Sequence, residues 1–113
     1  MSTEKRALYC VFRPEKMPST DEMRKLFETS YPIFVDMNSI EFKCWWCDKK
    51  KKEWGSFYVF QSEKALNEFV NSDRWQKVTP QKYGCIPQWV SLEVGAIISK
   101  TVITTFEGSW ENE

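Results

Sequence analysis

The residues with the clearest chemical potential lie in the middle of the chain, on a predicted β-hairpin. If the hairpin turns through Lys49 to Lys52, Lys43 lies directly opposite Tyr58 on the neighbouring strand. Trp45 and Trp54 then share a face of the sheet with this pair. An ammonium group and a phenol beside aromatic rings could bind a phenolic or enolic substrate and help to remove its proton. A Lys–Tyr packing pair without a catalytic role is the alternative.

Further aromatic residues are candidates for the lining of a ligand pocket. Aromatic side chains make up 16% of the chain, an excess that serves either a large core or a pocket for a flat, apolar ligand. Glu93 is a lone carboxylate among apolar residues and is expected to face either that pocket or solvent. The candidate substrate-binding residues are therefore Tyr9, Trp45, Trp75, Tyr83, Trp89 and Glu93.

The sequence contains no histidine, which removes the usual general base, most zinc sites and the common haem ligand. Cys44-x-x-Cys47 has the spacing of a redox or metal motif. On a strand, however, an offset of three places the two thiols on opposite faces. Zinc would need two more ligands, and only Cys10 and Cys85 remain among the thiols. We therefore expect reduced thiols, no metal and no cofactor.

The charge balance argues against nucleic acid and anionic membranes as partners. Lys plus Arg number 16 and Asp plus Glu number 16, so the formal net charge is zero. The run Lys49 to Lys52 is expected to be a solvated hairpin tip that protects the sheet from edge pairing. The sequence shows neither a secretory h-region nor a membrane-spanning run, so a cytoplasmic protein is expected.

The hydrophobic pattern predicts a strand, a helix, a hairpin of two strands, a second helix and a fourth strand. Ser19-x-x-Glu22 fits a capping box at the start of the first helix, and Pro32 is expected to follow its end. This β-α-β-β-α-β order predicts a ferredoxin-like α+β fold with an antiparallel sheet. The expected ranges are 7–12, about 20–30, 40–48, 53–60, 62 to about 75, and 88–98.

Both faces of the predicted hairpin carry apolar side chains, whereas helices cover only one face of such a sheet. A second copy of the sheet is the simplest cover for the other face, so we expect a homodimer packed sheet to sheet. The 113 residues are expected to form a single domain, with a core over about 6–98 and a C-terminal extension over 99–113. The strand-like tail could exchange between subunits.

The hairpin and the start of the second predicted helix carry three motifs, Lys43-x-Trp45, Glu53-x-Gly55-x-x-Tyr58-x-Phe60 and Glu63-Lys64-Ala65-Leu66. With these motifs the region resembles the YdhR-like monooxygenases, a family of the dimeric α+β barrel superfamily that is related to antibiotic-biosynthesis monooxygenases. The resemblance covers about Ile40 to Leu66. It implies a homodimer, a pocket between sheet and helices, and oxygenase activity without metal or flavin. It also adds Glu53 to Lys43 and Tyr58 as a catalytic candidate, although a place beside the hairpin tip favours a solvated carboxylate.

The resulting hypothesis is a cofactor-independent monooxygenase that acts on a small hydrophobic aromatic or polyketide-like substrate. Lys43, Tyr58 and Glu53 would supply polarity, while Trp45 and Trp75 would stack on the substrate. A cyclase or isomerase on the same scaffold, and a non-catalytic small-ligand-binding dimer, are the alternatives. Oxygen consumption separates the first from the second, and any turnover separates both from the third.

Overall fold

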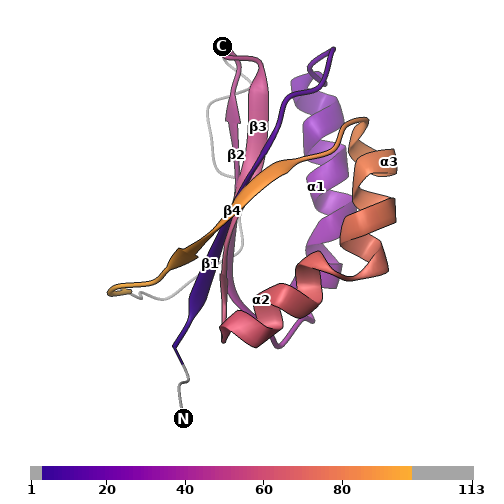
Figure 1. Ribbon diagram of the computed structural model, residues 1–113. Coiled ribbons are helices and arrows are strands. Elements are labelled where there is room, and N and C mark those ends of the chain that lie inside the picture. The colour runs from indigo at the N-terminus through magenta and orange to yellow at the C-terminus, as the bar shows by residue number, and fades with distance from the viewer. Residues whose placement is uncertain (1–3, 98–113) are drawn as a thin grey trace.

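In the part of the chain that the structure describes, four antiparallel strands form a sheet, and the helices lie on one face of it (Figure 1). The structure is a computed structural model, and it describes residues 4–97. The strands lie in the order β2-β3-β1-β4, which confirms the predicted ferredoxin-like α+β fold. The elements are β1 (Arg6–Phe12), α1 (Thr20–Val35), β2 (Ile40–Asp48), β3 (Glu53–Phe60), α2 (Glu63–Val70), η1 (Arg74–Val78), α3 (Thr79–Tyr83) and β4 (Gln88–Glu93).

The hairpin of β2 and β3 has the predicted register. Asp48 pairs with Glu53, and Lys43 pairs with Tyr58. The register shifts between Ile40 and Phe42, where the ladder is irregular. Simple alternation along the strand would place Ile40 and Phe42 on the same face of the sheet. With the shift they differ: Ile40 packs against the core, whereas Phe42 is exposed.

Helix α1 begins as predicted and ends later than predicted. The Ser19 hydroxyl accepts a hydrogen bond from the backbone of Glu22, and the Glu22 carboxylate accepts one from the backbone of Ser19. The helix continues through Pro32 to Val35, although proline cannot donate the backbone hydrogen bond of that turn. The added turn packs Phe34 against the rings of Trp45 and Tyr58. This packing opposes the helix-breaking effect of proline.

The second half of the chain differs more from the prediction. Ser62 caps α2 as expected, but α2 ends at Val70, and Trp75 belongs to the separate π-helix η1. The stretch expected to be a turn contains α3. Strand β4 is shorter than predicted, and the expected strand-like tail lies outside the described residues.

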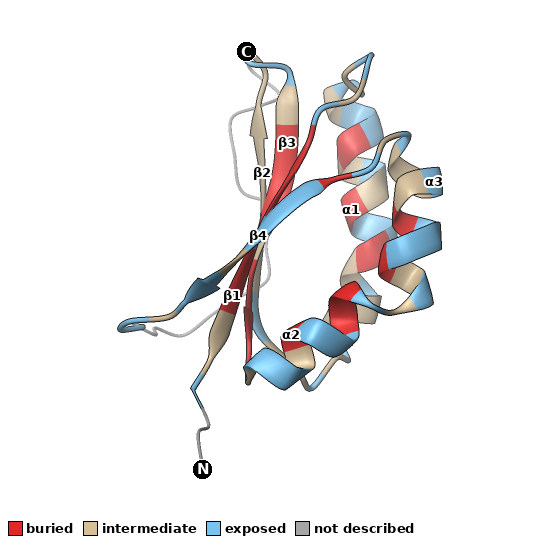
Figure 2. Ribbon diagram, in the orientation of Figure 1, coloured by how far each residue is buried: buried red, intermediate tan, exposed pale blue. Residues whose placement is uncertain are grey.

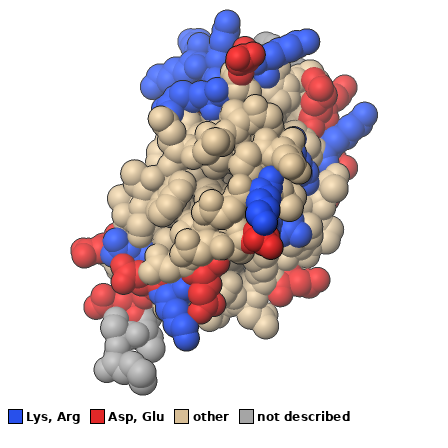
Figure 3. All heavy atoms as spheres, turned by 45° about the vertical axis from the view of Figure 1, so that its right-hand side comes forward, with Lys and Arg blue, Asp and Glu red and all other residues tan. Residues whose placement is uncertain are grey.

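The hydrophobic core lies between the sheet and the helices (Figure 2). Trp54, Phe12 and Phe27 are among its largest fully buried side chains. Trp54 stacks on Phe12 with ring centroids 4.2 Å apart. The charged turn from Lys49 to Lys52 lies at the upper end of the molecule, where Lys and Arg side chains gather (Figures 1 and 3).

No helix between residues 4 and 97 combines the length and the apolar character that crossing a membrane requires.

Candidate functional site

A hollow between the sheet and the helices is lined by aromatic and cationic side chains. The lining side chains fill most of it and leave a cavity of about 20 Å³. Every helix and the three strands β1, β2 and β3 contribute to its wall. The lining residues are Phe12, Ser30, Phe34, Lys43, Trp45, Trp54, Ser56, Tyr58, Phe69, Arg74, Trp75, Val78, Thr79, Lys82 and Tyr83.

Lys43 and Tyr58 meet at the sheet side of this hollow, as their pairing across the hairpin requires. Lys43 Nζ donates a hydrogen bond to the Tyr58 hydroxyl over 2.7 Å. The amine also lies over the rings of Phe34 and Trp45, 3.3 Å and 4.7 Å from their centroids. Tyr58 is buried, while Lys43 as a residue keeps intermediate exposure because only its amine end is enclosed by rings.

Burial shifts the proton equilibria of this pair in opposite directions. Desolvation lowers the pKa of Lys43 well below its usual value of 10.5. Desolvation raises the pKa of Tyr58 well above its usual value of 10.0. Both shifts favour the neutral form, so a larger fraction of the Lys43 amine is the free base than for an exposed lysine, beside a phenol that keeps its proton.

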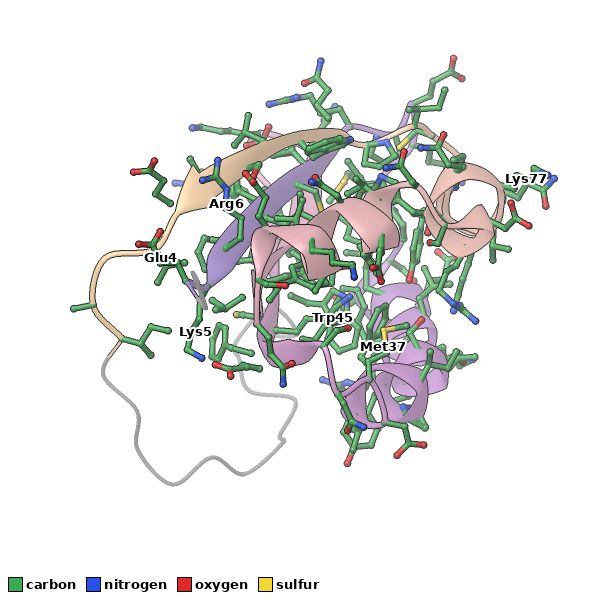
Figure 4. The ribbon with its side chains drawn as sticks, turned by 60° about the horizontal axis from the view of Figure 1, so that its bottom comes forward. Glu4, Lys5, Arg6, Met37, Trp45 and Lys77 are labelled. Carbon is green, nitrogen blue, oxygen red and sulfur yellow. The ribbon has the colours of Figure 1, made fainter. Side chains whose placement is uncertain are left out.

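Tryptophan and tyrosine rings form the walls beside this pair. Trp45 points inward and stacks on Phe27 of α1, with centroids 4.6 Å apart (Figure 4). Trp75 is buried against Tyr58 and Phe69. Such walls suit a flat ligand, because offset stacking and edge contacts stabilise aromatic pairs.

A second polar group lines the hollow on the helical side. Lys82 Nζ donates a hydrogen bond to Ser30 Oγ over 2.6 Å, and Ser30 Oγ lies 3.2 Å from the Tyr83 hydroxyl. Burial raises the pKa of Tyr83 and lowers that of Lys82. Arg74 of η1 completes this side.

Sequence reasoning missed Ser30, Phe34, Arg74 and Lys82. Phe34 follows Pro32, and the prediction ended the helix before that proline. Arg74 and Lys82 lie in a stretch whose helices η1 and α3 were not predicted as such. The sequence offered one indication of α3, which is Pro80. Proline is favoured in the first turn of a helix, and Pro80 lies at the start of α3.

The structure brings five predicted site residues to the hollow, and four others lie elsewhere. Lys43, Trp45, Tyr58, Trp75 and Tyr83 line it. Tyr9 alternates to the outer face of β1, where it stacks on Trp46 at 5.8 Å.

The remaining candidates lie at the periphery of the sheet. Glu53 pairs with Arg13, whose Nε lies 3.0 Å from its carboxylate, at the end of the hairpin. Trp89 and Glu93 lie on β4, an edge strand that none of the hollow's lining residues belongs to, and both are exposed.

The cysteines lie apart from one another along the sheet. Cys44 faces outward opposite Phe57, and Cys47 packs on the core side opposite Trp54. Cys10 is buried with its sulfur 3.1 Å from Ser56 Oγ, and burial raises the pKa of its thiol. Within residues 4–97 no three His, Cys, Asp or Glu side chains lie close enough to hold a metal ion.

The sequence matches no protein-family profile and no curated protein, but the fold is similar to several solved structures. SnoaB, a cofactor-independent oxygenase from Streptomyces nogalater, superimposes with a TM-score of 0.64 over 86% of this chain and 99% of SnoaB, at 8% identity. The ActVA-Orf6 monooxygenase of Streptomyces coelicolor, in complex with nanaomycin D, gives 0.58 over 88% of this chain and 94% of that enzyme, at 12% identity.

A protein of unknown function from Nitrosomonas europaea, NE2512, gives a TM-score of 0.68 at 13% identity, over 88% of this chain and 98% of NE2512. At these identities the likeness shows a shared fold, and the chemistry has to be argued from the hollow itself.

Proposed function

We propose that this protein is a cofactor-independent monooxygenase that acts on a small aromatic or polyketide-like substrate. The observation that carries the proposal is the hydrogen-bonded pair of Lys43 and Tyr58 at the wall of an aromatic hollow. The fold that it shares with SnoaB and ActVA-Orf6, both named as oxygenases, supports the same general chemistry.

Lys43 is the proposed base. An enzyme that oxygenates a CH₂ group attached to an aromatic ring without a cofactor must first form an electron-rich anion of the substrate. This anion is needed because it donates an electron to O₂. A neutral Lys43 amine accepts the proton of the phenolic or enolic group, and the lowered pKa of Lys43 makes this form more abundant than in an exposed lysine. In total, the CH₂ group and O₂ give a carbonyl group and water.

Tyr58 and the tryptophans are the proposed positioning elements. The Tyr58 hydroxyl, 2.7 Å from Lys43 Nζ, holds the amine in place and can donate a hydrogen bond to the substrate oxygen. Trp45 and Trp75 provide ring faces on which a planar substrate can stack. Glu53 is not included in this mechanism, because it pairs with Arg13 outside the hollow.

Oxygen uptake with hydroxylated anthrones and naphthols tests the proposal. We expect wild-type protein to consume O₂ and release a quinone, and K43M to lower the rate by about 10²–10⁴-fold, the usual contribution of a general base. Y58F removes a positioning hydrogen bond and should lower the rate less than K43M. K43R retains a positive charge but cannot act as a base at neutral pH, so it should be as slow as K43M. K64M, at an exposed position of α2, is the matched control and should keep the wild-type rate.

Two outcomes would contradict the proposal. Turnover of a panel substrate without O₂ consumption would indicate a cyclase or isomerase. Wild-type rates in K43R would show that charge, rather than proton transfer, is what the lysine supplies.

We also propose that the chain forms a homodimer through the outer face of its sheet. The support is that Tyr9, Phe42, Val90 and Leu92 are exposed by 38–49% on this face, which no described helix covers (Figures 1 and 2). Soluble monomers rarely expose such a contiguous apolar surface, and a second copy of the same sheet would complement it.

A further inference from the structure

The charged side chains that line the hollow are all positive. Lys43 comes from β2, Arg74 from η1 and Lys82 from α3, and no Asp or Glu is among the lining residues. The other polar side chains in the lining carry hydroxyl groups or, in Trp45, Trp54 and Trp75, an indole N–H. A hollow of this composition complements a ligand that brings hydrogen-bond acceptors and negative charge.

No acidic side chain in the described part of the chain pairs with any of these three basic groups. Between residues 4 and 97, neither Lys43 nor Arg74 nor Lys82 forms an ion pair, and the two lysines donate to neutral hydroxyls of Tyr58 and Ser30. Lys77, on the same helix as Arg74, differs in this respect, because its Nζ lies 3.7 Å from an Asp73 oxygen. Arg74 and Lys82 are therefore available to an anionic ligand, while Lys43 remains the proposed base.

The cations also act on one another. Burial lowers the pKa of Lys82, and the positive charge of Arg74 lowers it further. Burial is the main cause of the low pKa of Lys43, and the charge of Lys82 adds to it. An anion bound among them would relieve this repulsion, so its binding is coupled to all three groups.

A further unsatisfied group belongs to the same lining. Trp54 is only 1% exposed, and its indole Nε1–H has no hydrogen-bond partner in the structure. A buried donor of this kind destabilises the protein until an acceptor reaches it. A ligand oxygen is the acceptor that fits a hollow rich in donors.

We propose that the substrate carries a carboxylate on its aromatic ring system, and that Arg74 and Lys82 bind this group. The inference rests on the proposed function, because it specifies the substrate class of the same hollow. The ring then lies among the tryptophans beside Lys43, and the carboxylate lies on the helical side. Arg74 and Lys82 select the substrate without taking part in the oxygenation itself.

Matched ligands that differ only in charge test this inference. Benzoate, benzamide and benzylamine, and the naphthalene analogues 2-naphthoate and 2-naphthamide, would be titrated against wild-type protein by calorimetry and tryptophan fluorescence. We expect the carboxylates to bind at least about 10-fold more tightly than the amides, the ratio expected for hydrogen bonds to charged groups. The cationic benzylamine should bind weakest.

Variants assign the effect to the two cations. R74Q and K82Q should each weaken carboxylate binding about 10-fold or more while leaving amide binding unchanged. K77Q is the control, since Lys77 extends away from the protein body on the same helix as Arg74 (Figure 4). Unchanged amide binding in R74Q and K82Q shows that these variants fold with an intact hollow.

The results separate this inference from the proposed function. Three outcomes would contradict the carboxylate site. The carboxylates could bind no better than the amides, none of the five probes could bind, or K77Q could weaken binding as much as R74Q. Carboxylate selectivity without O₂ consumption leaves the site in place and removes the oxygenase. The opposite result is also possible. If wild type, R74Q and K82Q oxygenate neutral anthrones at equal rates and show no carboxylate selectivity, the oxygenase remains and the carboxylate site is removed.

Discussion

Lys43 is the residue at which function and stability conflict. Its amine lies over aromatic rings and hydrogen-bonds a phenol, so water is replaced by partners that solvate an ammonium ion less well. The rings offset part of this cost, since their faces attract a cation. A position that merely packed the core would be filled more favourably by an apolar side chain of similar length.

This conflict predicts a pH-dependent gain in stability for K43M. Below the lowered pKa of Lys43, both folded and unfolded chains hold the proton, and the full cost of burying the ammonium ion is present. Above it, the unfolded chain binds more protons than the folded chain, so wild-type stability rises toward pH 10. K43M should therefore exceed wild type by about 1 kcal/mol at pH 6 and lose this advantage by pH 9.5.

Urea denaturation at pH 6, 7.5 and 9.5 checks this prediction. Burial is the main cause of the raised pKa values of Tyr58 and Cys10, and both proteins share it. The Lys43 charge is the smallest contribution to the pKa of Cys10, and K43M removes it, so this part of the Cys10 effect remains in the difference. K64M, at an exposed position, should differ from wild type by a constant amount at all three pH values. The stability difference between K43M and wild type could also be the same at all three pH values. That result would show that the amine of Lys43 is solvated as well in the folded chain as in the unfolded one.

At the scale of elements, the sequence predicted what short-range patterns determine. Three features depend on neighbours close in the chain or on alternation along two adjacent strands. They are the capping box at Ser19, the hairpin through Lys49 and the Lys43–Tyr58 pairing. The sheet side of the candidate site was therefore available from the sequence alone.

The helical side was not available, because it depends on tertiary contacts. Helix α1 continues past Pro32, where Phe34 packs against Trp45. No local sequence pattern indicates that contact. The π-helix η1 and the short α3 are brief turns with weak propensity, yet they carry Arg74 and Lys82. The register shift near Ile40 likewise has no signature in the alternation of β2.

Gly55 shows how a single residue holds two elements at close range. A Cβ atom there would meet the backbone carbonyl of Cys10 on β1 and lie 2.8 Å from Trp46 Cζ2. We expect G55A to destabilise the protein by about 1–3 kcal/mol, because backbone must shift to admit the methyl group. Urea denaturation measures this, with G95A as control, since a Cβ at Gly95 meets nothing within 4 Å. Equal stabilities of G55A and G95A would mean that the strands separate at little cost.

The whole molecule has two unlike sides. Its helical side encloses the hollow, while the outer face of the sheet presents Tyr9, Phe42 and Val90 without charged neighbours at its centre. The ion pairs Arg13–Glu53 and Lys5–Glu41 lie near the two ends of the strands. An apolar centre with a charged rim is the arrangement of an interface between subunits.

The proposed homodimer predicts that one charge on this face separates the subunits. Wild-type protein at about 10 µM should sediment at twice the 13.5 kDa of the chain. V90K should sediment as a monomer, because a lysine at the centre of an apolar interface loses its hydration without gaining a partner. Ile86 is 80% exposed in the loop between α3 and β4, so I86K adds the same charge elsewhere and should stay dimeric. A monomeric wild type, or a V90K protein that sediments like I86K, would contradict this assembly.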